Sequence, residues 1–595
     1  MYRAPVDDLR FTLEHLLDAG QLAQLPLYRE FSIELASAVL EQADHFATGV
    51  LDPVNQQGDR HGATWTSKGV SAAPGFADAY RQYVADGWPQ LGIGSEHGGQ
   101  GAPFVLVSAV EEIWYGANMA LMLCPMLSRG AIEAVHLVGS QELKRTFLPQ
   151  MISGNWSGTM VLTEAQAGSD LGAIRTRATP TGDHYLLSGQ KIFISYGDHD
   201  MTENIVHLVL ARIEGAPSGV KGLSLFLVPK FMLDAQGKPA QPNDVHCVSI
   251  EHKLGIHASP TCVLAFGGEN GAVGYLVGEA NRGLECMFIM MNAARLSVGI
   301  QGIGLAERAL QQASAWARGR AQGRPIGSAS GAALPITYHP DVRRLLLSMR
   351  SGVEAMRALA LYAALQLDLG RAAAEPAERS AALLRGELLI PIVKGWGTEY
   401  GTELVSQGLQ VHGGMGYIEE TGIAQTLRDV RITTIYEGTT AIQANDLLGR
   451  KLARDGGAAM RALLAAIELE LKERQGEADA DGLSFVLVAA REGIGELRVA
   501  TDSLLASLGA TPAAAYAVGV PYLRLCGVTL GGWLMARAAR IAAVQLQKAA
   551  GQISWRSKLQ SARHYAAQTL PLALGLSRTV RSGGTSVAAA DVELL

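Results

Sequence analysis

The chain has 595 residues, of which 48% are apolar and 18% charged, and its formal net charge is −6. This length is too great for one hydrophobic core and predicts two to four domains. The acidic balance argues against a dedicated nucleic-acid-binding protein, which usually carries a strong basic excess. The five cysteines form no CxxC pair, so they predict scattered thiols in a reducing, cytoplasmic compartment.

Residues 1 to about 155 have the apolar spacing of helices, for example in 31–46 and 105–127. The stretch 51–73 is rich in Gly, Asp, Gln and Ser and predicts a long loop, and the glycines of 92–103 predict a second break. The start, MYRAPVDDLRF, lacks a long apolar segment, so no secretory signal is expected. The longest strongly apolar stretch, 525–536, is too short to cross a bilayer, so no membrane insertion is expected.

Short apolar or β-branched runs separated by turn residues begin near residue 157. TMVLTE, HYLLSGQKIFIS, NIVHLVLAR, GLSLFLV and TCVLAF have the spacing of a strand meander and predict a compact β domain. No long helical pattern interrupts them, so a parallel sheet with crossover helices is not expected.

Helical spacing returns after Gly283 and continues to about residue 451, where ARDGGAA interrupts it. A further helical region follows, and its composition is nearly balanced, with 14 Lys and Arg against 11 Asp and Glu in 456–595. The order therefore predicts an α+β protein whose domains span 1–156 (helical), 157–282 (β), 283–455 (helical) and 456–595 (helical). A β domain that meets helices is a common place for a ligand cleft.

Two segments of the predicted β domain carry residues suited to a planar ligand. In MVLTEAQAGSD at 160–170, Thr163 and Ser169 offer hydroxyls, and Gly168 allows the backbone to approach closely. In SGQKIFIS at 188–195, strict alternation would place the ring of Phe193 and the hydroxyl of Ser195 on one strand face. Taken alone, each segment also fits an ordinary strand that ends in a polar turn.

Basic residues mark two places in the helical part. Arg295 is expected at the start of a mostly apolar helix, where it could hold a phosphate or a carboxylate. A surface salt bridge, usually worth little, is the ordinary alternative. Arg320 and Arg324 flank Gln322 in a glycine-containing turn that could clamp a pyrophosphate, although a solvated basic loop is the more common outcome.

Glu437 follows the apolar run ITTIY and precedes Gly-Thr-Thr. Partial desolvation would raise its pKa towards working pH, which a base for a weakly acidic C–H bond requires. The alternative is a glutamate at a helix N-terminus, which the helix dipole favours. Upstream, the glycines after His412 would expose backbone to a phosphate-bearing ligand, and His412 itself is expected to serve turn structure.

These segments occur in a fixed order: T-E-x-x-x-G-S-D at 163–170, G-x-K-x-x-I-S at 189–195, Q-x-x-G-G-x-G at 410–416, Arg-Asp at 428–429 and Y-E-G-T at 436–439. As a set, they resemble the acyl-CoA dehydrogenase family over residues 87 to about 452. The resemblance implies a helical domain, a middle β-barrel-like domain and a helical bundle, to which this chain adds a C-terminal helical domain. It also implies FAD-dependent oxidation of an acyl-CoA thioester to the 2-enoyl-CoA, with electrons passed to an electron-transferring flavoprotein.

The resemblance assigns roles to individual residues. Glu437 would be the catalytic base, and the substrate would contact Ser169, Arg295, Glu437 and Gly438. Arg320, Gln322, Gln410 and Gly414 would reach the FAD of a neighbouring subunit. The remaining FAD contacts are implied for Met160, Leu162, Thr163, Gly168, Ser169, Phe193, Ser195 and Thr439. No metal is expected.

Several positions depart from the family pattern. Phe193 stands where the family usually has tryptophan, Ala165 where it has proline, Ala441 where it has glutamine, and Gly323-Arg324 where it often has an aromatic residue and a glycine. The opening YRAPVDDLRF and the C-terminal helices resemble a long bacterial subgroup. That subgroup contains 3-methylmercaptopropionyl-CoA dehydrogenases and some fatty acyl-CoA dehydrogenases, and we favour the former. A homodimer is expected, with a tetramer as the alternative.

Two other functions share the same fold. A flavin-containing DNA-associated protein would need a strongly basic C-terminal surface, which the near-balanced charge of 456–595 does not provide. An acyl-CoA oxidase would differ in passing electrons to oxygen, and the sequence leaves this alternative open, together with the length of the acyl chain.

Overall fold

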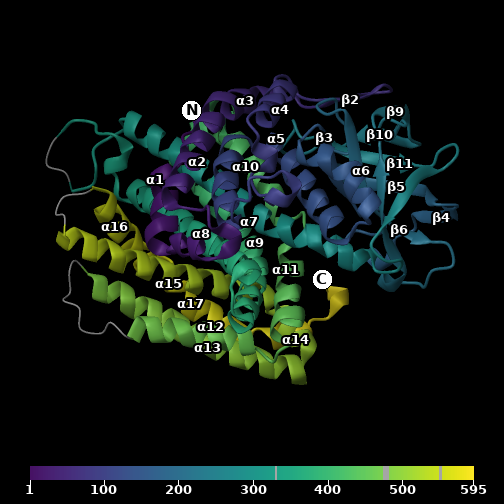
Figure 1. Cartoon of the computed structure of the whole chain (residues 1–595). Helices are drawn as coiled ribbons and strands as arrows, with labels where there is room; N and C mark the ends of the chain where they lie inside the picture. The colour runs from purple at the N-terminus through teal and green to yellow at the C-terminus, as the bar shows by residue number, and fades with distance from the viewer. Residues whose placement is uncertain (328–330, 473–481, 549–552, 595) are drawn as a thin grey trace. The chain divides into compact units, whose positions relative to one another are not determined.

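The structure is a computed structural model that describes residues 1–594 except 328–330, 473–481 and 549–552 (Figure 1). The described residues form two compact units. Unit 1 contains Met1, 45–102 and 117–295, and unit 2 contains 2–44, 103–116 and 296–595. The predicted order of helices, β domain, helices and further helices is confirmed, whereas the exact domain boundaries stay predictions.

The elements of unit 1 include the whole β domain. Its helices are α3 (Asp52–His61), α4 (Phe76–Ala85) and α6 (Gln141–Ile152). Its strands are β1 (Thr64–Thr66), β2 (Gly69–Ser71), β3 (Trp156–Val161), β4 (Arg177–Thr181), β5 (His184–Ser195), β6 (Asn204–Ile213), β7 (Leu223–Pro229), β8 (Phe231–Leu233), β9 (Pro239–Pro242), β10 (Val245–Ile250), β11 (Thr261–Phe266) and β12 (Ala272–Val277). Three helices begin in one unit and end in the other, namely α2 (Ile33–Phe46), α5 (Phe104–Val138) and α7 (Gly283–Gly319).

Five strands of the β domain form a closed ring. The pairings run β4–β5–β12–β7–β6 and return to β4, so the predicted barrel-like domain is confirmed. Strands β6 and β7 are buried along almost their whole length, which explains their near-continuous apolar sequence. Inside the domain, the rings of Tyr185 and Phe226 pack edge to face with centroids 5.0 Å apart.

The β domain departs from a simple meander in two pairings. Strand β6 pairs in parallel with β3 and with β4, although the other pairings are antiparallel. The strands β4 and β5 lie between β3 and β6 in the sequence, so they provide the crossover that parallel pairing requires without any long helix. The prediction of an uninterrupted meander was therefore wrong at these strands.

The predicted loop at 51–73 was also wrong. It contains the helix α3, which begins next to Pro53, and the hairpin of β1 and β2. The π-helical turn Ala47–Leu51 continues α2 into α3 without a break, so the polar stretch prolongs a helix that begins at Ile33. The hairpin contacts the β domain through the indole of Trp65, which donates a hydrogen bond of 2.9 Å to the carbonyl oxygen of Cys247.

Helix α5 is interrupted at Asn118, whose φ of −156° and ψ of 83° are not helical. The Asn118 side chain accepts a hydrogen bond from the backbone N–H of Leu121 and donates one to the carbonyl of Leu51. It therefore caps the second half of α5 in the manner of a helix N-cap. The break lies close to the point in the sequence, between Gly116 and Ala117, where the chain passes from unit 2 to unit 1.

Two helices, α5 and α7, are long and apolar enough to cross a membrane by composition alone, each with a mean hydropathy of 1.3 over its best window. They are longer apolar candidates than 525–536, which the sequence analysis singled out. About two thirds or more of each window, 67% and 72%, is buried inside the molecule. This burial is typical of core helices in soluble proteins, so the two windows are weak evidence for membrane insertion.

The named elements of unit 2 are all helices. Its elements, besides the shared helices, are α1 (Val6–Phe11), α8 (Pro340–Ala372), α9 (Pro376–His412), α10 (Ile423–Arg431), α11 (Thr440–Asp446), α12 (Ala458–Lys472), α13 (Leu483–Ala510), α14 (Pro512–Ala517), α15 (Gly519–Lys548), α16 (Ile553–Gln568), α17 (Leu572–Ser582) and α18 (Gly584–Ala588). The predicted C-terminal helical region therefore corresponds to α12–α18, drawn green to yellow in Figure 1.

Helices α7 and α9 cross at closely spaced glycines. A side chain at Gly302 would place its Cβ 2.6 Å from the carbonyl oxygen of Gly397, and one at Gly401 would lie 2.7 Å from the carbonyl oxygen of Gly302. Only glycine permits backbones to approach this closely. The contact explains why the apolar helix that contains Arg295 continues with glycines.

A buried charge cluster joins the first helix to three long helices. The Arg357 guanidinium of α8 donates hydrogen bonds to Glu112 of α5, to Glu307 of α7 and to Asp8 of α1. The ammonium of Lys558, in α16, pairs with the same Asp8 carboxylate. Breaking a buried pair leaves an uncompensated charge, which costs about 3–5 kcal/mol. The cluster therefore ties the C-terminal helices to the N-terminal segment.

Candidate active site

In unit 1, the structure brings together the two segments that the sequence analysis singled out in the β domain. The backbone N–H of Ile192 donates a hydrogen bond of 2.9 Å to the carbonyl oxygen of Thr163. The Lys191 ammonium donates one of 2.8 Å to the carbonyl oxygen of Leu162. The end of β3 and the second half of β5 therefore form one surface, although they are about 30 residues apart in the sequence.

A buried ion pair fixes this junction. The Glu164 carboxylate lies 3.0 Å from the Lys191 ammonium and also accepts hydrogen bonds from the backbone and hydroxyl of Thr176. Burial raises the pKa of Glu164, but Lys191 and these hydrogen bonds outweigh it and lower the pKa to about 2. Burial lowers the pKa of Lys191 to about 8, against the opposing effect of Glu164. Sequence reasoning assigned no role to this pair, although both residues lie within the quoted motifs.

Phe193 occupies a strained position in β5. Between Lys191 and Ile194 the strand has two residues opposite one residue of β11, which is a β-bulge, and Phe193 has a φ of 59°. A bulky residue in the left-handed region is uncommon and costs about 1 kcal/mol or more. The bulge breaks the strict alternation that the sequence analysis assumed. It leaves the Phe193 side chain 60% exposed, and Ser195 follows in the ladder opposite Thr261.

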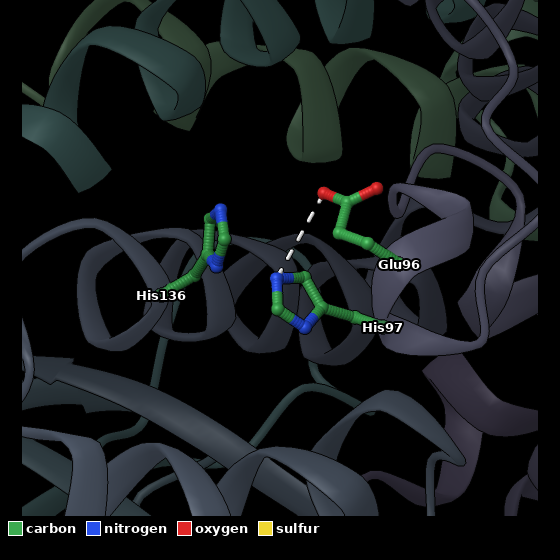
Figure 2. Close-up of side chains that lie close together, drawn as sticks. All are labelled: Glu96, His97 and His136. Carbon is green, nitrogen blue, oxygen red and sulfur yellow. Dashed lines mark ion pairs between the residues drawn. The ribbon is translucent and has the colours of Figure 1, made fainter.

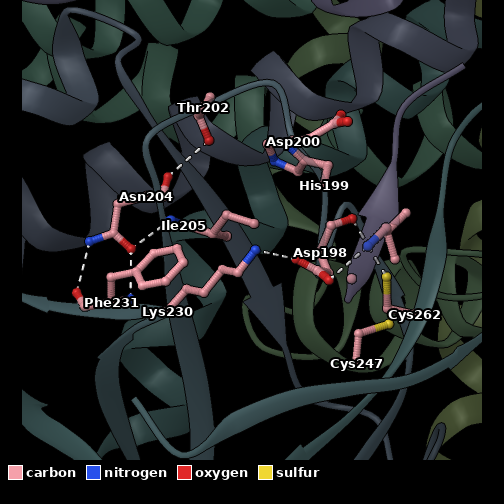
Figure 3. Close-up of polar contacts among 12 residues, drawn as sticks. Asp198, His199, Asp200, Thr202, Asn204, Ile205, Lys230, Phe231, Cys247 and Cys262 are labelled. Atoms are coloured by element: carbon pink, nitrogen blue, oxygen red, sulfur yellow. Dashed lines mark hydrogen bonds and ion pairs between the residues drawn. The ribbon is translucent and has the colours of Figure 1, made fainter. Parts of the chain in front are cut away.

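The chain that follows Ser195 is firmly held (Figure 3). The Tyr196 hydroxyl donates a hydrogen bond of 2.8 Å to the carbonyl oxygen of Ala120. Next, the Asp198 carboxylate pairs with Lys230 at 2.5 Å and accepts a hydrogen bond from the backbone N–H of Val70. The figure shows the side chain of Lys230, which lies between β7 and β8, reaching towards Asp198. These contacts give the Phe193–Ser195 segment a rigid support.

The other predicted residues of unit 1 lie on either side of Thr163 in the sequence, except for Arg295. Met160 and Leu162 are partly buried and pack against a hydrophobic core of the unit, while Gly168 and Ser169 are exposed in the turn that follows. Arg295 is buried well inside α7, with its guanidinium 5.8 Å from the centre of the Phe288 ring. The predicted helix start at Arg295 was therefore wrong, because α7 already begins at Gly283.

In unit 2, Glu437 lies in a turn and has a φ of 55°, again in the left-handed region. Helix α11 begins only at Thr440, and Thr439 caps it by accepting a hydrogen bond from the N–H of Ile442. Glu437 therefore precedes the cap and is not part of a helix N-terminus, which excludes that alternative for this residue. The preceding phenol of Tyr436 donates a hydrogen bond to the side-chain oxygen of Gln301, and burial, then the Glu437 charge, raises its pKa.

Two buried side chains hold the backbone at Glu437. The Lys394 ammonium, fully buried in α9, donates a hydrogen bond of 2.7 Å to the carbonyl oxygen of Gly438. The Gln443 amide donates one of 3.0 Å to the carbonyl oxygen of Glu437 and one of 3.2 Å to that of Gly438. Sequence reasoning missed both residues. A single lysine inside the apolar run LLIPIVKGWG was the signal that could have revealed Lys394.

The remaining predicted residues lie on exposed backbone at one end of α7 and α9. Arg320 and Gln322 are exposed just after α7, on a short extended segment that pairs with 334–336. Gln410 and Gly414 are exposed at the end of α9 and just beyond it. The rings of Trp316 and His412 stack with centroids 5.3 Å apart and join the two helix ends. His412 thus serves local structure, as expected.

Each unit thus presents one group of predicted residues whose backbone is fixed by buried charge. In unit 1 it consists of the exposed ring of Phe193 on a segment that is hydrogen-bonded to the segment of Thr163, which suits a planar polar ligand. In unit 2 it consists of a carboxylate in a strained turn, which suits proton transfer.

Four family models match the chain, and together they span most of its length. They are described as the acyl-CoA dehydrogenase N-terminal domain (35–155), middle domain (159–268) and C-terminal domain (281–452), and as acetyl-CoA dehydrogenase C-terminal like (460–591).

Among curated proteins, the chain is 47% identical to the 3-methylmercaptopropionyl-CoA dehydrogenase of Ruegeria pomeroyi, with 96% of each chain covered. It is 34% identical to a broad-specificity linear acyl-CoA dehydrogenase of Mycobacterium tuberculosis, again with 96% of each chain covered. Among solved structures, an acyl-CoA dehydrogenase of Bacillus anthracis complexed with FAD is similar in fold, with a TM-score of 0.71 and 19% identity. That match covers 100% of this chain and 94% of the other.

Proposed function

The chain belongs to the acyl-CoA dehydrogenase family, and we propose that it oxidises the bond between the α and β carbons of an acyl-CoA thioester with Glu437 as its base. The observation that carries this proposal is the strained turn at Glu437. Its backbone is held by hydrogen bonds from Gln443 to the carbonyl oxygen of Glu437 and from Lys394 to that of Gly438. A base whose backbone is held in this way needs less ordering at the moment of proton transfer.

The residues on the β domain fit FAD as the cofactor. Phe193 offers an exposed aromatic face in a rigid bulge. The hydroxyls of Ser195, two residues later, and of Thr163 and Ser169, on the segment that is hydrogen-bonded to Ile192, offer polar groups. A Cβ at Gly168 would meet no heavy atom within 4 Å, so the backbone there is open to a ligand. When bound, FAD would supply the acceptor for the hydride that leaves the β carbon. The B. anthracis relative in fold was solved with this cofactor.

The chain's own residues have three tasks in the reaction. The Glu437 carboxylate takes the proton from the α carbon. The backbone N–H of Glu437 donates a hydrogen bond to the thioester carbonyl, where negative charge develops, in the manner of an oxyanion hole. Met160, Leu162 and Gly438 shape the surroundings of the reacting group, and Arg295 is assigned to the substrate side.

A second copy of the chain would complete the cofactor site. Arg320, Gln322, Gln410 and Gly414 are all exposed, as residues that reach the FAD of a neighbouring subunit must be before assembly. The turn after α9 also exposes apolar side chains, with Tyr417 85% and Met415 45% exposed. Exposed apolar groups of this kind commonly mark a protein interface. We therefore propose a homodimer or a tetramer built on this surface.

We propose 3-methylmercaptopropionyl-CoA as the preferred substrate, an electron-transferring flavoprotein as the electron acceptor and the cytoplasm as the location. The substrate proposal rests on the 47% identity to the R. pomeroyi enzyme of that name over 96% of both chains. The alternative, a fatty acyl-CoA, rests on the 34% identity to the broad-specificity linear acyl-CoA dehydrogenase.

The base is tested by Glu437→Gln, which keeps the size of the side chain and removes its ability to take a proton. Loss of a general base lowers turnover by about 10²–10⁴-fold. We expect that loss in kcat with normal flavin absorbance, measured with an artificial electron acceptor. Glu378→Gln, at an exposed position in α9, is the matched control and should keep full activity. Near-normal turnover of Glu437→Gln would contradict the assignment.

The substrate is tested by anaerobic bleaching of the flavin with a panel of thioesters. Pentanoyl-CoA is the sharpest comparison for 3-methylmercaptopropionyl-CoA, since a methylene replaces the sulfur at nearly equal length. One methylene in an apolar pocket is worth about 1–3 kcal/mol, or roughly 10–200-fold in rate. We expect these two to react fastest and hexadecanoyl-CoA at least tenfold more slowly. Faster reaction of the long chain would favour the fatty acyl alternative, and peroxide release in air would indicate an oxidase.

A further inference from the structure

Three potential metal ligands meet in unit 1, in the part of the chain before the β domain. Glu96 and His97 lie in a short 3-10 helix (Ser95–His97) between α4 and α5, and His136 lies in the last turn of α5. One ligand atom from each residue can be chosen so that all three lie within 4.8 Å of one another. Figure 2 shows the Glu96 carboxylate above the ring of His97, with the ring of His136 beside it.

The two imidazole rings are close but do not stack face to face. Their centroids are 4.3 Å apart and their planes are inclined by 72°. Two nitrogen ligands on one tetrahedral zinc ion, at about 2.0–2.1 Å from the metal, are separated by about 3.3 Å. The ligand atoms of the three residues lie within 4.8 Å of one another, so side-chain rotations that move them closer by up to about 1.5 Å would bring them to bonding distance.

His97 provides a second, independent observation. Its Nε2 atom is shielded from solvent and makes no hydrogen bond within the described residues. The Glu96 carboxylate is the ion-pair partner of this nitrogen, but the distance of 3.8 Å is beyond hydrogen-bond reach. A buried ring nitrogen without a hydrogen bond costs about 1–3 kcal/mol, so a bound ion at this point would satisfy it.

The loop that carries Glu96 and His97 is built to present them. A Cβ at Gly94 would collide with the Glu96 carboxylate, and Gly98, which ends the 3-10 helix, has a φ of 80°. Hydrogen bonds from Gln100 and Gly101 to the carbonyls of Gln90 and Ile93 close the loop on itself. The two side chains are therefore held next to each other by a compact turn, and His136 comes from a rigid helix.

We propose that Glu96, His97 and His136 form a binding site for a first-row transition metal ion, with Zn²⁺ as the ion best suited. Imidazole and carboxylate ligands suit this group of metals, and sites with three protein ligands complete their coordination with water. The Glu96 side chain is 64% exposed, so water has access to the remaining position. The ion would fasten the glycine-rich loop at 92–103 to the end of α5. No metal was expected from the sequence, in which Glu96 and His97 precede His136 by about 40 residues.

The site is tested by calorimetric titration of the purified, chelator-treated full-length protein with ZnCl₂. We expect the parent protein to bind one equivalent of zinc per chain with high affinity. The affinity should be at least tenfold lower in each of His97→Ala, His136→Ala and Glu96→Gln. His184→Ala is the matched control. His184 also pairs with a carboxylate, that of Asp183 at 2.9 Å, but it does not belong to the group of three ligands. Unchanged binding in the three variants, or no binding by the parent protein, would overturn the proposal.

Co²⁺ and hydrogen exchange provide readouts that do not depend on activity. Co²⁺ bound by two imidazoles and a carboxylate gives visible absorption bands at longer wavelengths than oxidised flavin, and His136→Ala should abolish them. Zinc should also slow amide exchange in 92–103 in the parent protein but not in His97→Ala. Circular dichroism and thermal unfolding of each variant establish that it is folded. Cobalt bands that persist in both histidine variants would assign the ion to another site and refute this one.

Discussion

The ammonium group of Lys394 donates a hydrogen bond of 2.7 Å to the carbonyl oxygen of Gly438, the residue that follows the proposed base. Lys394 is fully buried, and burial of an ammonium group is costly unless its hydrogen bonds are satisfied. The chain therefore retains a buried lysine whose ammonium group contacts the backbone of the proposed catalytic turn.

Lys394→Met should misplace this turn while keeping an apolar side chain of similar length. We expect kcat to fall about 10–100-fold with little change in KM, because misplacement of a catalytic group by about 1 Å costs roughly 10²-fold. Lys548→Met, at an exposed position of α15, is the control and should leave both constants unchanged. A rise in KM alone would show that Lys394 serves substrate binding and does not position Glu437.

Phe193→Gly should separate backbone strain from ligand contact. Glycine adopts positive φ without a steric penalty, so the variant should relieve about 1 kcal/mol of strain at the bulge while it removes the exposed ring. We expect unchanged or higher resistance to urea together with weaker retention of flavin on dialysis. Phe193→Val, a β-branched residue, should lower stability instead. Flavin retention equal to that of the parent protein would contradict a cofactor contact at Phe193.

The pair of Glu164 and Lys191 should give the protein a measurable acid dependence. The folded-state pKa of Glu164 is about 2, below its ordinary value, so its contribution to stability is present above about pH 4.5 and is lost as the pH falls towards 2. The slope from one such group is at most about 1.4 kcal/mol per pH unit.

The measurement is urea unfolding between pH 3 and 6, compared with the double variant Glu164→Gln/Lys191→Met. The double variant replaces both charges, because removing one alone would leave the other buried and unpaired. Its unfolding free energy should depend less steeply on pH in this range. Parallel pH profiles for the two proteins would show that Glu164 titrates normally in the folded state.

Gly302→Ala should destabilise unit 2 through one methyl group. Its Cβ would lie 2.6 Å from the carbonyl oxygen of Gly397, and overpacking of this kind costs about 1–3 kcal/mol. Gly319→Ala is the matched control in the same helix, since a Cβ there meets no heavy atom within 4 Å. Thermal unfolding should show a lower midpoint for the first variant only. Equal midpoints would mean that α7 and α9 can move apart at no cost.

The sequence predicted the element types well where apolar periodicity was strong. The strands β6 and β7 and the helices α2, α5 and α9 agree with it. It failed at 51–73, where polar composition concealed α3, and at Arg295, which was placed at a helix start although the helical spacing already returns after Gly283. Composition alone does not report a helix that is stabilised by its tertiary contacts.

The candidate site was predictable in its exposed residues and not in its supports. Motif order singled out Phe193 and Glu437, but strand alternation gave no sign of the bulge that re-aims Phe193. Lys191 and Lys394 were missed because periodicity does not distinguish a buried, satisfied lysine from a surface one. Their roles depend on partners that are distant in the sequence, Glu164 for the first and Gly438 for the second.

The contacts of Asp8 have a consequence for how the protein is made. This residue belongs to the first helix, but its partners Arg357 and Lys558 follow roughly 350 and 550 residues later. At a synthesis rate of about 5–20 residues per second, the N-terminal helix waits roughly half a minute to two minutes for the last of them. During that time, its apolar side chains Leu9 and Phe11, which are buried in the finished protein, have not yet met their final neighbours. The contact between Asp8 and Lys558 can therefore form only after α16 has been synthesised.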